Sequence, residues 1–297
     1  MHHTTRSRLA LLTVSIIYGA NYSIAKILLD PNWIGPNAFI FFRVSASAML
    51  FFLVVRRFPR IDRRDAGIFL LCSFTGIIGN QLLFFNGLKR TSPIHAALLM
   101  VCTPLLVLIF RAMQGTRLNH WQWLGCFVGM AGAAYLIVSV PSAGQQKASL
   151  MGDLMVLSNA LLYGYYLLRA PELIRKYGSL PMLSALFALA VLPVLAVSWQ
   201  EILLFDAAGF GLREWLAFAF VLIATSFLAY ALNAYALKHT NPETVSLYIY
   251  LQPLFATLIA LASGKDNWTA TYLVAACLIF SGIFLSGKKN PPSPQKS

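Results

Sequence analysis

The sequence predicts an all-α integral membrane protein. Ten transmembrane helices would form two inverted repeats of five, with both chain termini in the cytoplasm. Three observations lead to this fold class: an apolar composition, ten long hydrophobic runs, and a motif that occurs once in each half of the chain. The first separates the chain from soluble proteins, the second counts the helices, and the third relates the helices to one another.

The composition indicates that lipid surrounds most of the chain. Of the 297 residues, 58% are hydrophobic and 11% are charged, whereas soluble domains have roughly 45–50% apolar and about 25% charged residues. Ten Asp and Glu with 23 Lys and Arg cannot cover a soluble protein of this size. The net charge of +13 would suggest nucleic-acid binding in a soluble chain. In a membrane protein it is an orientation signal, and no nucleic-acid partner is expected.

Ten apolar runs account for nearly all of the chain. A helix that crosses the hydrocarbon core needs about 20 mostly apolar residues. The predicted spans are residues 8–28, 36–55, 66–87, 93–113, 120–140, 151–169, 180–199, 213–237, 243–264 and 270–286. The first run follows Arg6 and Arg8 and could be a signal peptide, but it has no evident cleavage site and nine further runs follow. We therefore interpret it as a span.

Lys and Arg are distributed unevenly between the two sides of the membrane. With ten spans both termini share one side, whose loops carry 16 of these residues, against 5 in the opposite loops. Cytoplasmic loops are enriched in Lys and Arg. The termini are therefore predicted to be cytoplasmic.

An internal repeat divides the chain into residues 1–145 and 146–297. The stretch 87–93 (GLKRTSP) resembles 236–242 (ALKHTNP) at an offset of 149, and Tyr18-Gly19 matches Tyr163-Gly164 at an offset of 145. Because each unit has five spans, an odd number, the two copies must enter the membrane in opposite directions. Inverted repeats are typical of secondary transporters, whose substrate site lies near the midplane between the repeats.

The chain resembles the EamA-type transporters of the drug/metabolite transporter superfamily over nearly its whole length. The resemblance rests on the stretch 18–22 with Lys26, on Arg43, on the stretch 91–105 with its second-half copy ending at 252–254, and on 152–154. Tyr18 stands where the family usually has Trp. The resemblance implies ten helices and cytoplasmic termini in a bacterial inner membrane. It also implies export of small metabolites such as amino acids through a cavity lined by spans 1, 3, 4, 6, 8 and 9.

Polar and aromatic side chains within the spans are the candidate substrate-binding residues. Such residues usually face the interior of the bundle, and helical spacing places them on shared faces. They are Tyr18, Asn21, Tyr22, Asn80, Gln81, Phe84, Tyr163, Tyr166, Tyr230, Asn233, Tyr250 and Gln252. Aromatic walls with amide and hydroxyl groups suit a neutral or zwitterionic solute of modest size. The alternative is that the amides only join helices, at about 0.6 kcal/mol each.

Two prolines are candidate hinges. Pro104 and Pro253 fall near the middle of spans 4 and 9. A proline lacks the N–H group and crowds the carbonyl four residues earlier, here that of Met100 or Ile249. We therefore expect both helices to be kinked and a carbonyl to be freed near the midplane.

Few charged residues lie within the spans. Lys26 is expected to extend to the headgroups. Arg43 needs a partner, either backbone carbonyls or a substrate carboxylate, and a structural role is expected because span 2 is peripheral in the family's fold. Asp153 lies in a helix's first turn and no carboxylate lies in mid-span, which weakly favours facilitated diffusion or exchange over proton coupling. His95 is interpreted as structural.

Other function classes have little support. No nucleophile–base set, metal-ligand spacing or phosphate loop occurs, so we expect neither an enzyme nor a bound cofactor or metal. The expected partners are a small-molecule substrate and the lipid bilayer, with the chain a monomer or a dimer. The alternatives are a flippase for a lipid-linked intermediate and a non-transporting membrane scaffold. The substrate, a coupling ion and the direction of transport stay open.

Overall fold

The computed structural model describes residues 2–29, 33–139, 149–263 and 270–286, and all regular secondary structure in this part of the chain is helical, with no strand. Seven helical stretches are long and apolar enough to cross a membrane. They are Thr5–Leu29, Pro36–Val55, Arg63–Lys89, Pro93–Met113, Ser179–Leu203, Leu212–His239 and Thr244–Ala262. The predicted all-helical membrane fold is confirmed. The number of ten crossings and their directions stay predictions, and the predicted repeat boundary at 145/146 lies outside the described residues.

The first half of the chain contains ten helical elements as far as it is described. They are α1 (His2–Ile24), α2 (Lys26–Leu29), α3 (Pro36–Val55), η1 (Arg63–Asp65), α4 (Ala66–Ser73), η2 (Phe74–Ile78), α5 (Gly79–Lys89), α6 (Pro93–Met100), α7 (Thr103–Met113) and α8 (His120–Ser139). The second half follows with α9 (Leu150–Tyr177), α10 (Ser179–Leu203), α11 (Leu212–Phe220), η3 (Val221–Leu228), α12 (Ala229–His239), α13 (Pro242–Leu247), η4 (Tyr248–Leu251), α14 (Gln252–Ala262) and α15 (Ala270–Ser286).

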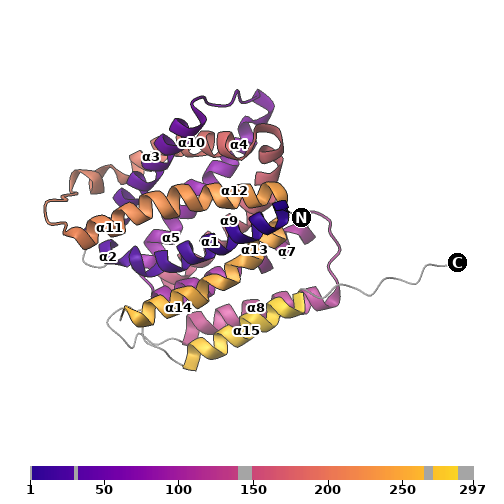
Figure 1. Ribbon diagram of the computed structural model, residues 1–297. Coiled ribbons are helices and arrows are strands. Elements are labelled where there is room, and N and C mark those ends of the chain that lie inside the picture. The colour runs from indigo at the N-terminus through magenta and orange to yellow at the C-terminus, as the bar shows by residue number, and fades with distance from the viewer. Residues whose placement is uncertain (1, 30–32, 140–148, 264–269, 287–297) are drawn as a thin grey trace.

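The most extensive helix contacts join one half of the chain to the other. α3 packs on α10, α5 on α9 and α8 on α15, while α1 lies between α12 and α14 (Figure 1). The larger of the two buried apolar clusters likewise draws residues from both halves. A cavity at the centre of this arrangement is therefore lined by both halves.

Glycines allow the closest of these approaches. Gly125 and Gly129 on α8 face Gly282 on α15, and a Cβ atom on Gly282 would lie 2.4 Å from the backbone nitrogen of Gly129. No side chain larger than hydrogen fits this contact without moving the helices apart. The small residues bring the backbones together, as is usual where helices meet in a membrane.

The two halves carry irregular turns at matching places. The stretches Arg63–Lys89 and Leu212–His239 each contain a π-helical turn, η2 and η3. The stretch Pro93–Met113 is interrupted between α6 and α7, and Thr244–Ala262 contains the 3₁₀ turn η4. π-Turns within helices are often found at functional sites.

Pro104 and Pro253 lie in the first turns of α7 and α14, directly after these interruptions. The helices are broken where the prolines predict. The carbonyl of Met100, however, is not left without a partner as we expected, because it accepts a hydrogen bond from the Thr103 hydroxyl at 2.7 Å. In the other half the hydroxyl of Ser15 donates to the carbonyl of Tyr248 at 2.7 Å. Neighbouring hydroxyls thus stabilise both breaks.

Candidate substrate cavity

A cavity lies between the halves and contains about 530 Å³ free of protein atoms, its opening included. Its wall is formed by Tyr18, Asn21, Tyr22, Arg43, Asn80, Gln81, Phe84, Phe85, Met100, Asn159, Tyr163, Tyr230 and Gln252. These residues come from α1, α3, α5, α6, α9, α12 and α14. Nine of the twelve predicted binding residues line it.

Aromatic rings form one part of the wall. The rings of Tyr22 and Phe84 meet edge to face with centroids 5.4 Å apart, and those of Phe84 and Phe85 with centroids 4.9 Å apart. The Tyr22 hydroxyl donates to Oε1 of Gln252 at 3.3 Å, which joins α1 to α14. The rings are therefore held by each other and by hydrogen bonds, so a flat apolar group could pack against a preformed surface.

Amide side chains form another part of the wall, and several of their polar atoms have no hydrogen-bond partner in the described chain. These atoms are Oδ1 of Asn21, Oδ1 of Asn159, and both Oε1 and Nε2 of Gln81. Asn159 does use its Nδ2 group, which donates to the carbonyl of Asn80 at 2.7 Å. Buried polar atoms almost always have a partner, in protein or in ordered water. Unpaired amides around a cavity therefore indicate a wall that binds water or a polar solute.

Arg43 contributes a cationic side chain to the described cavity wall, although it was not among the predicted binding residues. Its side chain is 3% exposed, and its Nε donates to the hydroxyl of Ser226 at 2.7 Å. The guanidinium carbon lies 4.2 Å from the ring centroid of Phe85, while Nη1 has no partner in the described chain. We expected a structural role because span 2 is peripheral. Although α3 is a neighbouring helix, this long side chain extends from it to the cavity wall.

The two π-turns hold cavity residues in place. In η2 the carbonyl of Gly76 accepts a hydrogen bond from the Tyr230 hydroxyl at 3.0 Å. In η3 the Ser226 hydroxyl donates to the carbonyl of Val221 at 2.7 Å and accepts from Arg43. Each π-turn thus provides the partner of a side chain from another helix, and so they position Tyr230 and Arg43.

Three predicted residues do not line the cavity. Tyr166 packs on Gly76, where a Cβ atom would lie 2.5 Å from its ring. Asn233 borders a separate, smaller pocket and donates to the Tyr163 hydroxyl at 3.3 Å. Tyr250 lies on the 3₁₀ turn η4, with its ring 6.2 Å from that of Phe280. A 3₁₀ turn has three residues per turn instead of 3.6, so α-helical spacing assigns Tyr250 to the wrong face.

Phe85, Met100 and Asn159 also line the cavity without having been among the predicted binding residues. Asn159 lies four residues before Tyr163, and the helical spacing of span 6 does place the two on one face. Phe85 and Met100 are apolar residues in apolar helices and carry no comparable signal.

The structure corrects the expectation for Lys26 and gives His95 a buried partner. Lys26 is fully buried, so its predicted extension to the headgroups is wrong. His95 is also fully buried, and its Nδ1 lies 2.7 Å from Oδ1 of Asp153, which is 1% exposed. The first turn of α9 thus contains a buried carboxylate that is paired with an imidazole. Burial of Asp153 weakens the sequence argument against proton coupling.

A sequence model of the EamA-like transporter family matches residues 6–138 and residues 150–287 of the chain. Among curated relatives, the uncharacterized transporter YyaM of Bacillus subtilis is 25% identical over 93% of this chain and 92% of its own length. The uncharacterized inner membrane transporter YedA of Escherichia coli is 21% identical over 96% and 94%. The aromatic amino acid exporter YddG of Ancylobacter novellus is 24% identical over 70% and 71%.

A crystal structure with 18% sequence identity matches the fold with a TM-score of 0.64, covering 96% of this chain and 98% of the other. At this identity the match concerns the fold alone. It extends over nearly all of both chains, so the helical arrangement around the cavity is that of a known fold.

Proposed function

The chain belongs to the EamA-like transporter family, and from that premise we propose that it carries a small carboxylate-bearing metabolite, such as an amino acid, across the bacterial inner membrane. The observation that carries this proposal is the cavity wall, in which a buried guanidinium and unpaired amides stand beside aromatic rings.

The polar atoms of the wall complement a zwitterion. Nη1 of Arg43 is an unpaired donor with a positive charge, and a guanidinium binds a carboxylate strongly. The unpaired oxygens of Asn21, Gln81 and Asn159 accept hydrogen bonds, as an ammonium group requires. The rings of Tyr22, Phe84 and Phe85 offer an apolar surface for a side chain. The name of YddG, an aromatic amino acid exporter, agrees with this chemistry.

We further propose alternating access between two inverted five-helix halves, with ten crossings and cytoplasmic termini. Two features support this mechanism: the family model matches two successive stretches of similar length, and each half carries a π-turn and a proline-associated break at corresponding places. Pro104 and Pro253 serve as the hinges. Broken helices near a central site allow one half to rock against the other.

Flux in proteoliposomes tests the substrate assignment. We expect saturable transport of radiolabelled L-phenylalanine. Competition should be strong with phenylalanine and weak with phenethylamine, which lacks the carboxylate, or with 3-phenylpropionate, which lacks the ammonium group. Empty liposomes provide the control.

A panel of amino acids, nucleosides and amphiphilic cations should be tested in the same vesicles. If nothing in the panel is transported or competes, the transporter proposal fails. Strong competition by phenethylamine would contradict the role of Arg43 while leaving transport intact. Translocation of a fluorescent phospholipid without amino acid flux would favour the flippase alternative.

A further inference from the structure

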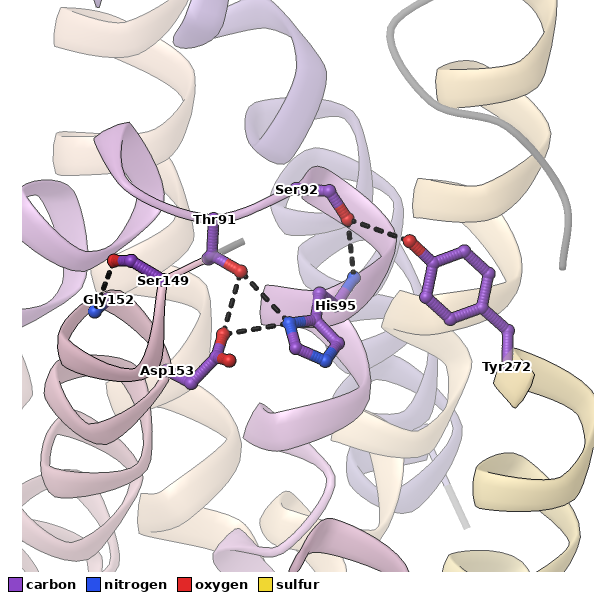
Figure 2. Close-up of polar contacts among 7 residues, drawn as sticks. All are labelled: Thr91, Ser92, His95, Ser149, Gly152, Asp153 and Tyr272. Carbon is purple, nitrogen blue, oxygen red and sulfur yellow. Dashed lines mark hydrogen bonds and ion pairs between the residues drawn. The ribbon is translucent and has the colours of Figure 1, made fainter. Parts of the chain in front are cut away.

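A second buried polar cluster joins the two halves of the chain. We name it the polar clasp and define it as Thr91, Ser92, His95, Asp153 and Tyr272. The Thr91 hydroxyl donates to Oδ1 of Asp153 at 2.7 Å and lies 3.0 Å from Nδ1 of His95. The hydroxyls of Ser92 and Tyr272 are 3.2 Å apart. Figure 2 shows these side chains converging from α6 and the turn before it, from α9, and from α15.

The backbone around the polar clasp is closely fitted. The amide of Ser149 donates to the carbonyl of Arg90 at 3.0 Å, and the Ser149 hydroxyl accepts from the amide of Gly152 at the start of α9 (Figure 2). A Cβ atom on Gly152 would lie 2.8 Å from Cβ of Arg90. Residues 90–95 of the first half are therefore held against the first turn of α9 in the second.

The pair of His95 and Asp153 is suited to hold a proton. Two acceptors do not approach to 2.7 Å without a hydrogen between them, so a proton is shared between Nδ1 of His95 and Oδ1 of Asp153. If Nε2 is also protonated, the pair is an imidazolium and a carboxylate with no net charge. When that proton leaves for water, a carboxylate charge stays buried without a cation, which is costly in a low-dielectric site.

Few charged side chains on the neighbouring helices could neutralise Asp153 after this proton leaves. In the described chain α14 has no titratable side chain, and the other charges of α9 begin at Arg169, more than four turns from Asp153. The guanidinium of Arg90 is occupied by the Asn86 carbonyl at 2.6 Å. On the other helices packed against α6, the titratable groups described are Arg6, Arg8, Tyr18 and Tyr22 on α1, Lys89 on α5, His120, Cys126 and Tyr135 on α8, and Tyr272 and Cys277 on α15.

The corresponding place in the other half has no such pair. At the repeat offset of 149, His95 corresponds to Thr244, whose amide is capped by Asn241 just as that of His95 is capped by Ser92. At the offset of 145, Asp153 corresponds to Arg8, which is exposed. The capping geometry is shared by both halves, whereas the buried histidine–carboxylate pair is present in one.

We propose that His95 and Asp153 form a proton-binding site that locks the two halves together at one end of the bundle and releases them when the proton leaves. The inference adds proton control to the proposed alternating access. α6 begins at the polar clasp and ends at Met100 in the cavity wall, so its movement connects the two sites. Transport should therefore depend on pH through a group that does not touch the substrate.

Thermal unfolding of purified protein in detergent between pH 5.5 and 8.5 tests proton binding without a substrate. If the pair binds a proton in the folded protein, the unfolding temperature of the wild type should depend on pH in this range more strongly than that of a variant without the pair. His95→Gln should have a lower unfolding temperature at pH 8 than the double variant His95→Gln/Asp153→Asn, because it alone leaves a carboxylate without its cation.

The double variant should lose the pH dependence, and the matched control Thr244→Ala should keep it. A wild-type unfolding temperature that does not change with pH would overturn the proposal. So would a double variant that retains the wild-type pH dependence. If His95→Gln does not fold, the wild type and the double variant still decide the question.

Cysteine labelling tests whether the two halves separate at the polar clasp when the proton leaves. In a Cys277→Ser background, which leaves three buried native thiols, Ser92→Cys at the polar clasp is compared with Asn241→Cys at the matching place in the other half. The ratio of their maleimide labelling rates should rise several-fold from pH 6 to pH 8.5, since the ratio cancels the general reactivity of thiols. An unchanged ratio would overturn release by proton loss. Because no substrate is needed, this failure is distinguishable from failure of the proposed transport.

Discussion

The cavity and the polar clasp are both buried and polar, and they differ in how their polar atoms are paired. Around the cavity, side-chain atoms of Asn21, Arg43 and Gln81 have no partner in the described chain. In the polar clasp, Thr91, His95 and Asp153 bond to one another. Unpaired buried atoms reduce stability until a ligand or water pairs with them, whereas paired atoms stabilise the fold. This difference supports the proposed binding role of the first region and the proposed control of opening by the second.

The largest expected effect is that of Arg43→Met. Removing one partner of a buried charge pair costs about 2–5 kcal/mol of binding energy, so phenylalanine flux should fall by about 30-fold or more. Stability should be unchanged or higher, because a buried donor disappears and Ser226 keeps its bond to Val221. Proteoliposome flux and thermal unfolding measure both. If Arg43→Met loses stability as well as flux, Arg43 has a structural role rather than a binding role.

Thr91→Val is expected to lower stability and leave transport affinity unchanged, the opposite of Arg43→Met. It removes the hydroxyl that donates to Asp153, and leaving a buried acceptor with one bond fewer costs about 1–3 kcal/mol of stability. The unfolding temperature should fall, while the Michaelis constant for phenylalanine should stay within twofold of wild type. Thr240→Val, at the matching place in the other half, is the control. A raised Michaelis constant in Thr91→Val alone would mean that the polar clasp contacts the substrate.

A smaller effect is expected for Gln81→Leu. Both polar atoms of this amide are unpaired, so an apolar side chain of similar size should leave the unfolding temperature equal or higher. Loss of a hydrogen bond to the substrate costs about 1 kcal/mol, which lowers phenylalanine affinity about fivefold to tenfold. Competition binding measures this. A drop in stability without a change in affinity would contradict the assignment of Gln81 to the binding wall.

The smallest effect is expected for Tyr250→Phe. The ring of Tyr250 packs near Phe280 outside the cavity, and the substitution keeps the ring. Flux and unfolding temperature should both lie within experimental error of wild type. Tyr22→Phe is the matched comparison, since its hydroxyl bonds to Gln252 at the cavity wall, and it should lower flux measurably. Equal losses in the two variants would extend the binding site to η4.

Local spacing predicted much of the cavity, because residues on one helix face point the same way. Tyr18, Asn21 and Tyr22 on α1, and Asn80, Gln81 and Phe84 on α5, were found by this rule and line the cavity. The rule is wrong at Tyr250, where the helix is 3₁₀ rather than α. The spacing rule does not identify Arg43, because this residue lines the cavity only through the length of its side chain, which extends from α3.

By itself the sequence determined the class of protein and the kind of residue at the site. Apolar runs must be helices in lipid, because every backbone group has to be paired within its own segment, and polar side chains in such helices turn inward because lipid offers them no partner. These constraints act within one helix.

Only the tertiary structure decided which inward residues meet. His95 and Asp153 lie 58 positions apart, and their contact depends on how α6 packs against α9. Arg43 and Ser226 likewise come together only because a π-turn in the second half faces α3. Pairing between helices depends on their separation and rotation, which no single helix encodes, and this pairing separates the binding wall from the polar clasp.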